Sequence, residues 1–216
     1  MTIFRSMSAV RACAALGALL LALFALPAVA QEAPDALVKR VSQEALQVIK
    51  TDPKVQAGDQ ARVRELIETK LAPHFDVDRM TALAAGRAYR SATPEQKKQL
   101  ADQFRTLLIR TYSTALNQYR DQTIEYRPLK MAPTDTEVVV RSLIKQKSGA
   151  DPIDINYSME KTDAGWKVYD VVIAGVSLVQ NYRSSFASEI QKSGVDGLIA
   201  TLVAKNKTLG QQVTRK

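Results

Sequence analysis

The stretch GWKVYDVVIAGVSLVQNYRSSF, residues 165–186, changes near its centre from the pattern of a strand to that of a helix. Residues 166–173 are mostly β-branched, aromatic or apolar, which is typical of a strand in a sheet. Gly175 ends the strand, and Ser177 followed by Gln180 has the pattern of a capping box that begins a helix. The stretch therefore joins the last strand of a sheet to a C-terminal helix. The apolar face of that helix comprises Val179, Tyr182, Phe186 and Ile190.

Three further strands are expected before this stretch. Residues 124–127 and 153–158 alternate apolar with polar side chains, and residues 138–144 are β-branched and mostly apolar. The segments between the strands are short and rich in turn-forming residues. Because short turns join antiparallel neighbours, we expect a four-stranded antiparallel meander.

The part of the chain before the strands has helical periodicity. Apolar residues recur at helical spacing in residues 37–49 and again in residues 63–71. Pro73 is expected to end the second helix, and a short third helix is predicted over residues 78–87. Helices, a run of strands and then helices again, without βαβ alternation, indicate α+β architecture. A glycine at position 194 is expected to interrupt the C-terminal helical segment.

A long amphipathic helix is predicted directly before the strands. Thr93 stands at its N-cap, Pro94 at its first position and Gln96 where a capping box requires it. Arg105 is one of the polar residues that fall outside the apolar stripe, which indicates a helix lying on a core. The stripe comprises Leu100, Phe104, Leu107, Leu108, Tyr112, Leu116 and Tyr119.

The first 30 residues have the three parts of a secretory signal peptide. Two arginines precede an uncharged apolar run at residues 14–25, and residues 28–30 form an A-x-A cleavage site. A short membrane anchor is the alternative, but the apolar run is well below the roughly 20 residues that span a bilayer. We therefore predict a cleavable signal peptide over residues 1–30 and export to the periplasm.

The predicted mature chain, residues 31–216, is long enough for a single domain with a real core. The only cysteine, Cys13, leaves with the signal peptide, which excludes a disulfide, a thiolate nucleophile and a cysteine metal site. The full chain carries a net charge of +8, but its basic residues are scattered. The scattering of the basic residues and the expected export of the protein both argue against nucleic acid as a partner. We expect a soluble monomer.

The sequence is poor in catalytic chemistry. Its only histidine, His74, follows a proline at a helix end, where a capping or packing role is expected rather than that of a general base. No G-x-S-x-G elbow and no metal-ligand spacing is present, so we predict no catalytic residue, no metal and no cofactor. Asp170 lies in an apolar strand, where it could act as a base of raised pKa. The favoured alternative is a structural bond from Asp170 to Arg183, Tyr182 or a backbone amide that locks the last helix to the sheet.

Three blocks of the chain, in this order, resemble one known family. They are PHFDVDRMTALAAGR at residues 73–87, ATPEQ with FRTLLIRTY within residues 92–112, and residues 165–186. The blocks resemble the MlaC, or toluene-tolerance, family of periplasmic phospholipid carriers. Two departures are Tyr89, where a tryptophan is expected, and Ala174, where an acidic residue often precedes the glycine.

The resemblance implies a fold similar to the nuclear-transport-factor and cystatin type, with an apolar pocket. It implies a carrier that shuttles phospholipid between an outer-membrane lipoprotein–porin complex and an inner-membrane ABC transporter complex with its membrane-anchored substrate-binding subunit. Physical chemistry agrees with such a role, because a lipid of about 30 methylenes, at ~0.8 kcal/mol each, cannot cross water unaided.

The carrier needs hydrocarbon-like walls and few polar contacts. Small residues within 80–86, near the expected pocket mouth, either leave space for tails or allow close helix packing. Arg87 and Arg90 are candidates for headgroup contact or docking. The residues expected to contact the tails are Phe75, Met80, Leu83, Phe104, Leu107, Leu108, Tyr112, Leu116, Ile124, Val140, Ile155, Tyr157, Val171, Ile173, Val179 and Tyr182.

Two other functions stay open at this point. A ketosteroid-isomerase type of enzyme would need Asp170 aimed into an apolar cavity beside Tyr157. A ligand-free envelope adaptor would have a filled core, no cavity and an exposed apolar patch.

Overall fold

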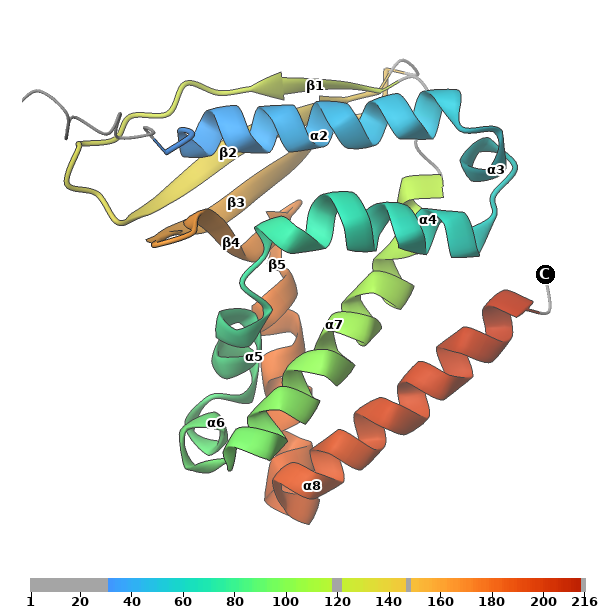
Figure 1. Cartoon of the computed structure of the whole chain (residues 1–216), viewed down its shortest axis with the longest axis vertical. Coiled ribbons are helices and arrows are strands. Elements are labelled where there is room, and N and C mark those ends of the chain that lie inside the picture. The colour runs from blue at the N-terminus through green and yellow to red at the C-terminus, as the bar shows by residue number, and fades with distance from the viewer. Residues whose placement is uncertain (1–30, 118–121, 147–148, 215–216) are drawn as a thin grey trace, which may run out of the picture. The chain divides into compact units, whose positions relative to one another are not determined.

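The elements follow the predicted order of helices, strands and helices (Figure 1). The computed structural model describes residues 31–117, 122–146 and 149–214, so the predicted signal peptide and Tyr119 lie outside the described residues. The first helices are α2 (Pro34–Thr51), α3 (Pro53–Gln56), α4 (Gln60–Leu66), the π-helix η2 (Ile67–Leu71), the 3₁₀ helix η3 (Ala72–His74), α5 (Val77–Ala85), α6 (Arg87–Ser91) and α7 (Pro94–Asn117). The strands are β1 (Thr123–Tyr126), β2 (Glu137–Lys145), β3 (Ile153–Thr162), β4 (Gly165–Ile173) and β5 (Val176–Ser177), and α8 (Leu178–Thr214) follows.

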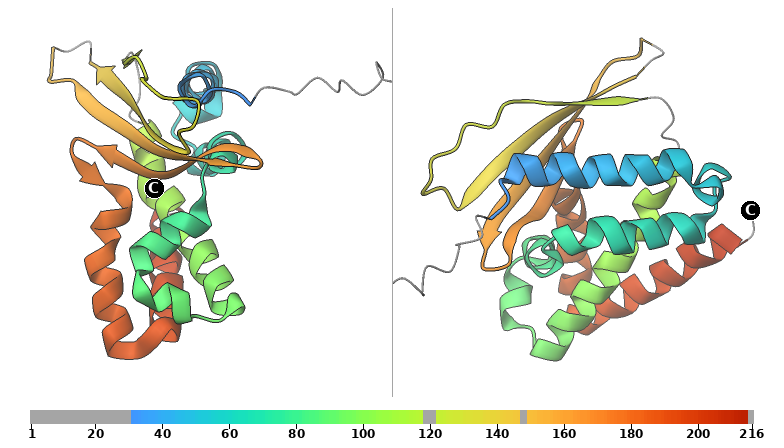
Figure 2. Two further views of the ribbon diagram at one scale, coloured as in Figure 1. Left: turned by 90° about the vertical axis from the view of Figure 1, so that its left-hand side faces the viewer. Right: turned by 45° about the horizontal axis from the view of Figure 1, so that its top comes forward.

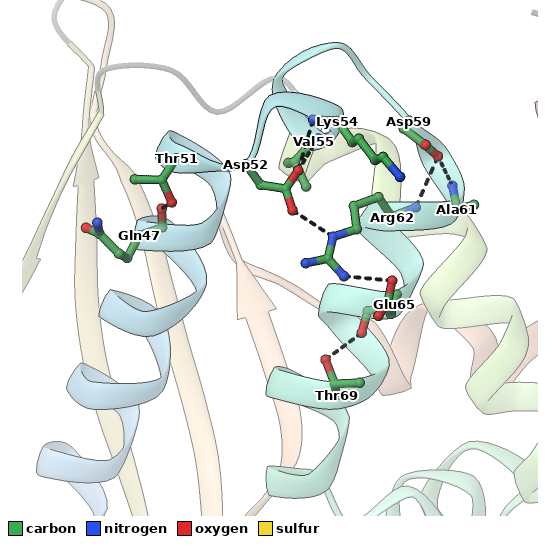
Figure 3. A network of polar contacts seen from close by, with 10 residues as sticks. All are labelled: Gln47, Thr51, Asp52, Lys54, Val55, Asp59, Ala61, Arg62, Glu65 and Thr69. Atoms are coloured by element: carbon green, nitrogen blue, oxygen red, sulfur yellow. Dashed lines mark hydrogen bonds and ion pairs between the residues drawn. The ribbon is translucent and has the colours of Figure 1, made fainter.

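A polar network holds the turn between α2 and α4 (Figure 3). The Asp52 carboxylate caps α3 by accepting from the backbone N–H groups of Lys54 and Val55. The Arg62 guanidinium lies 2.7 Å from the carboxylates of both Asp52 and Glu65. The network therefore fixes α4 beside the end of α2 through caps and charge-assisted hydrogen bonds.

The helices after α4 differ from the predicted ones. Instead of ending at Pro73 as a regular α-helix, α4 continues through a π-helical turn and a 3₁₀ turn. The short helix predicted over residues 78–87 is present as α5, but it ends at Ala85, before Gly86, and a second short helix, α6, begins after that glycine. Gly86 has φ 64° and ψ −131°, a conformation that a residue with a Cβ rarely adopts. The chain therefore changes direction at Gly86.

The predicted capping box of α7 is confirmed. The Thr93 N–H donates to Gln96 Oε1 at 3.0 Å, and the Gln96 N–H donates to Thr93 Oγ1 at 3.2 Å. The Gln96 side chain also donates to the carboxylate of Asp196 in α8 at 2.8 Å. The cap thus begins α7 and ties its first turn to the C-terminal helix.

The strands form an antiparallel meander in the order β1-β2-β3-β4-β5. This confirms the predicted α+β architecture and meander, with a fifth strand that the prediction omits. The extra strand, β5, has only two residues and pairs with the end of β4. Ala174 and Gly175 form the hairpin turn with φ of 48° and 82°, as two-residue turns between right-twisted strands require.

The helix α8 consists of two arms that meet at Gly194 (Figure 2). This glycine has φ 70° and ψ −172°, which confirms the predicted interruption. Hydrophobic residues of α5, α7 and α8 form one core cluster. A second cluster joins α2 to the sheet, and a third joins α2 to α4. The packed core is therefore divided between a helical part and a sheet part.

Candidate functional site

A cavity of about 640 Å³ lies between one face of the sheet and the helical elements η2, η3, α5 and α7. Its volume falls within the roughly 300–1,000 Å³ that is common for ligand sites. Most of its lining is apolar, and the described residues that line it are Ile67, Leu71, Ala72, Phe75, Val77, Met80, Arg105, Leu108, Ile109, Tyr112, Leu116, Gln122, Ile144, Gln146, Ile153, Ile155, Tyr157, Val171, Ile173 and Leu178.

Cross-strand pairs form the sheet wall of the cavity. In the antiparallel register Ile144 pairs with Ile153 between β2 and β3, and Ile155 pairs with Ile173 between β3 and β4. Because side chains alternate between faces along a strand, these pairs point to the same side of the sheet. The apolar residues of the predicted alternation in β3 therefore form one continuous apolar surface with their partners in β2 and β4.

The other wall is one face of α7, formed by Leu108, Ile109, Tyr112 and Leu116. A different face of α7, about a third of a turn away, carries Leu100, Phe104 and Leu107, which are fully buried against α5 and α8. The single apolar stripe predicted for this helix thus comprises two faces. One face packs against protein, and the other borders the cavity.

Nine of the sixteen residues predicted to contact lipid tails line the cavity. They come from four separate parts of the chain, which the fold brings together around one space. The nine residues are Phe75, Met80, Leu108, Tyr112, Leu116, Ile155, Tyr157, Val171 and Ile173.

The other seven predicted residues are not among the described residues that line the cavity. Phe104 and Tyr182 pack edge to face with ring centroids 5.2 Å apart, and Phe186 joins them. Because these rings fill the space between α7 and α8, they stabilise the helical core instead of facing a ligand. Leu83, Leu107 and Val179 belong to the same helical cluster, Val140 is buried in the cluster between α2 and the sheet, and Ile124 lies on the edge strand β1 opposite Ile144.

The small residues near position 84 serve close helix packing. Ala84 and Ala85 are buried in the helical cluster with residues of α7 and α8. Of residues 80–86, only Met80 is among the described residues that line the cavity. None of the small residues of this segment is in the described cavity wall, which favours the alternative of close helix packing.

Sequence reasoning missed several residues of the cavity wall. Ile144 and Ile153 are predictable from the sequence, because they continue the alternation that includes the predicted residues Val140 and Ile155. Ile67, Leu71 and Ala72 lie in η2 and η3, where the number of residues per turn departs from 3.6. No α-helical pattern could have shown which of these side chains face the cavity.

The arginines at the site are not the predicted ones. Arg87 and Arg90 are exposed on α6 and are absent from the described cavity wall. Arg105, which the pattern placed outside the apolar stripe, lines the cavity and is exposed to solvent. It is the only charged side chain among the described residues that line the cavity.

The other polar groups of the wall are uncharged. Burial raises the pKa of the Tyr157 phenol above its ordinary value, and burial also raises the pKa of Tyr112. Both phenols therefore stay neutral over the physiological pH range. Gln122 and Gln146 add amide groups near the paired ends of β1 and β2. The wall consequently favours an apolar ligand with polar groups at its periphery.

Asp170 has the structural role that the sequence favours. Its carboxylate accepts a hydrogen bond from the Ser177 hydroxyl at 2.6 Å and another from the Val179 backbone N–H at 3.2 Å. It thereby links β4 to the first turn of α8, with a backbone amide as one of the predicted partners. Asp170 is not part of the described cavity wall, so the arrangement that an isomerase would need beside Tyr157 is not formed.

The described residues also contain no group of three or more histidine, cysteine, aspartate or glutamate side chains suited to a metal ion. His74 ends η3, and its pKa is lowered chiefly by burial and further by the nearby Arg40 and Lys167. None of the helices within the described ranges has the length and hydropathy of a membrane span. Among the described residues, the candidate site therefore consists of the apolar cavity.

This fold and this cavity define a class of protein, small α+β domains that enclose an apolar ligand-binding cavity between sheet and helices. The sequence model of the MlaC protein family matches residues 39–204. The chain belongs to the MlaC family.

Three known proteins illustrate this similarity. The chain is 25% identical to the intermembrane phospholipid transport system binding protein MlaC of Haemophilus influenzae, over 81% of this chain and 83% of that one. It is 28% identical to the toluene tolerance protein ttg2D of Pseudomonas putida, over 82% of each chain. A solved structure of a phospholipid-binding protein from Ralstonia solanacearum, in complex with a phospholipid, has a TM-score of 0.76 and 41% identity, and the match covers 82% of this chain and 98% of that one.

Proposed function

We propose that this protein is a periplasmic phospholipid carrier that holds the acyl tails of its cargo in the cavity between the sheet and α7. The observation that carries the proposal is the apolar cavity of about 640 Å³. The phospholipid complex of the similar Ralstonia protein supports it. Each buried methylene contributes ~0.8 kcal/mol, so the tails supply most of the binding free energy and selectivity among headgroups is weak.

The nine predicted residues in the wall, together with Ile109, Ile144 and Ile153, are proposed to contact the tails. They combine aliphatic side chains of two layers with the neutral phenols of Tyr112 and Tyr157. Such a wall replaces water around the tails without leaving a buried charge unpaired. The presence of a cavity argues against the ligand-free adaptor, and the bonds of Asp170 argue against the isomerase.

We further propose that the protein is exported and exchanges its lipid with membrane complexes. The charged, apolar and A-x-A parts of residues 1–30 support cleavage after Ala30 and release into the periplasm. Family membership supports a shuttle between an outer-membrane lipoprotein–porin complex and an inner-membrane ABC transporter complex. A lipid held by many methylenes leaves slowly by itself, which is a physical reason for a carrier to have partners that load and unload it.

The direct test is native mass spectrometry of the protein purified from a periplasmic fraction, followed by lipid extraction. We expect an intact mass that begins at Gln31 and carries diacyl phospholipid in stoichiometric amount. A lipid-free mass, with no uptake from phospholipid vesicles, would refute the carrier function. A mass that retains residues 1–30 would refute the proposed export.

A further inference from the structure

Arg105 occupies a distinctive place in the cavity wall. It precedes Leu108 and Ile109 by one turn on the cavity-facing side of α7, and from Arg105 to Leu116 the helix extends about 16 Å. The residues on this side between them are apolar apart from the phenol of Tyr112. The wall formed by α7 is therefore a hydrophobic strip with one exposed cation at its N-terminal end.

Within the described part of the chain, the Arg105 guanidinium faces no acidic partner. Among the residues that the structure describes, it has no ion-pair or hydrogen-bond partner. Asp102, the acidic residue one turn earlier, instead pairs with Lys98 at 2.7 Å. A guanidinium has planar N–H groups that match phosphate oxygens in pairs. An unpaired arginine beside an apolar wall is thus available to an anionic group that enters with an apolar ligand.

At the opposite end of the strip, the described residues of the cavity wall carry no charge. Gln122 and Gln146 lie near the paired ends of β1 and β2, beyond Leu116 along the cavity wall, and both are neutral. A phospholipid has its phosphate at one end of its tails. The charge distribution of the described wall favours the Arg105 end for that phosphate.

We propose that Arg105 binds the phosphate of a phospholipid whose tails fill the cavity, and this inference rests on the proposed function. The contact recognises a group that all phospholipids share. It therefore orients the lipid and distinguishes it from an uncharged diacylglycerol, without distinguishing one phospholipid headgroup from another.

The test compares the release of two lipids with identical acyl chains, phosphatidylethanolamine and diacylglycerol, from loaded protein to neutral phosphatidylcholine vesicles. We expect Arg105→Gln to speed release of the phospholipid about threefold to fivefold, as befits an exposed charge contact, and to leave diacylglycerol release unchanged. Arg90→Gln is the matched control, because Arg90 is exposed and outside the described cavity wall. It should change neither rate.

Several results would overturn the inference. They are unchanged phospholipid release from Arg105→Gln, equal acceleration with both lipids, and an effect specific to phospholipid in Gln146→Ala but not in Arg105→Gln. Calorimetry with inorganic phosphate separates a lipid phosphate from a free one, since Arg105-dependent binding of the free ion would assign the residue to another ligand. Failure of the wild-type protein to retain either lipid would instead refute the proposed function itself.

Discussion

Replacing Leu108 with aspartate should abolish lipid retention without unfolding the protein. Leu108 is half-buried and lines the cavity, so water in an empty cavity can solvate the new carboxylate. Acyl tails would exclude that water, and desolvation of one ion in a protein costs several kcal/mol. A cost of about 3 kcal/mol corresponds to roughly a hundredfold loss of affinity.

The assay is the phospholipid-to-protein ratio after purification from a periplasmic fraction, measured by lipid extraction, with circular dichroism to confirm folding. Val203→Asp adds the same charge at an exposed position of α8, where the native side chain is 47% exposed. It should retain lipid as the wild type does. A folded Leu108→Asp variant with the wild-type lipid ratio would show that the tails do not contact this wall.

A substitution of Leu107, the residue next to Leu108, tests the face of α7 that packs against protein. Leu107 is fully buried in the helical cluster on the other apolar face of α7. Leu107→Ala should lower the free energy of unfolding by about 2–5 kcal/mol while the folded protein keeps its lipid. Loss of lipid from folded Leu107→Ala, together with retention in Leu108→Asp, would reverse the assignment of the two faces.

Three further predictions concern stability, each measured by denaturant unfolding. Asp170→Asn should lower the free energy of unfolding by about 1–2 kcal/mol, because its bonds to Ser177 and Val179 lose a charged acceptor; no change would contradict its role at the start of α8. Since the pKa of His74 is lowered by folding from its ordinary value of 6.5, the unfolded chain takes up a proton first as the pH falls below 6.5. Stability should therefore decrease from pH 7 to pH 5, and His74→Gln should weaken that dependence; an identical pH profile in the variant would refute the assignment. Gly194→Ala should cost about 1–3 kcal/mol, because φ 70° and ψ −172° are accessible essentially to glycine alone; an unchanged midpoint would show that the bend between the arms of α8 does not require this conformation.

Local signals in the sequence were sufficient for much of the fold. The capping box at Thr93, the alternation in residues 153–158 and the interruption at Gly194 all have short-range causes, and each is confirmed. The failures are also local in origin. The helix predicted over residues 78–87 ends at Ala85 instead of Arg87 because the backbone of Gly86 is not helical. The strand β5 has only two residues, too few to produce a periodic pattern.

The cavity wall was less accessible to sequence reasoning. The periodicity of α7 predicts one apolar stripe and places Arg105 outside it. Once α5 and α8 cover one part of that stripe, the remainder and Arg105 share the side that borders the cavity. The position of Arg105 at the cavity depends on neighbours that are distant in the sequence. The periodicity within α7 therefore does not predict it.

The sequence by itself determined the order of helices and strands, the meander and the position of the bend in α8, because these depend on residues close together in the chain. Only the tertiary structure decided which apolar residues face the cavity and which pack against protein. The physical reason is that a neighbouring side chain and an acyl tail satisfy an apolar residue equally well. Phe104 and Tyr112 therefore look alike in sequence, but Phe104 packs against aromatic rings of α8 whereas Tyr112 borders the cavity.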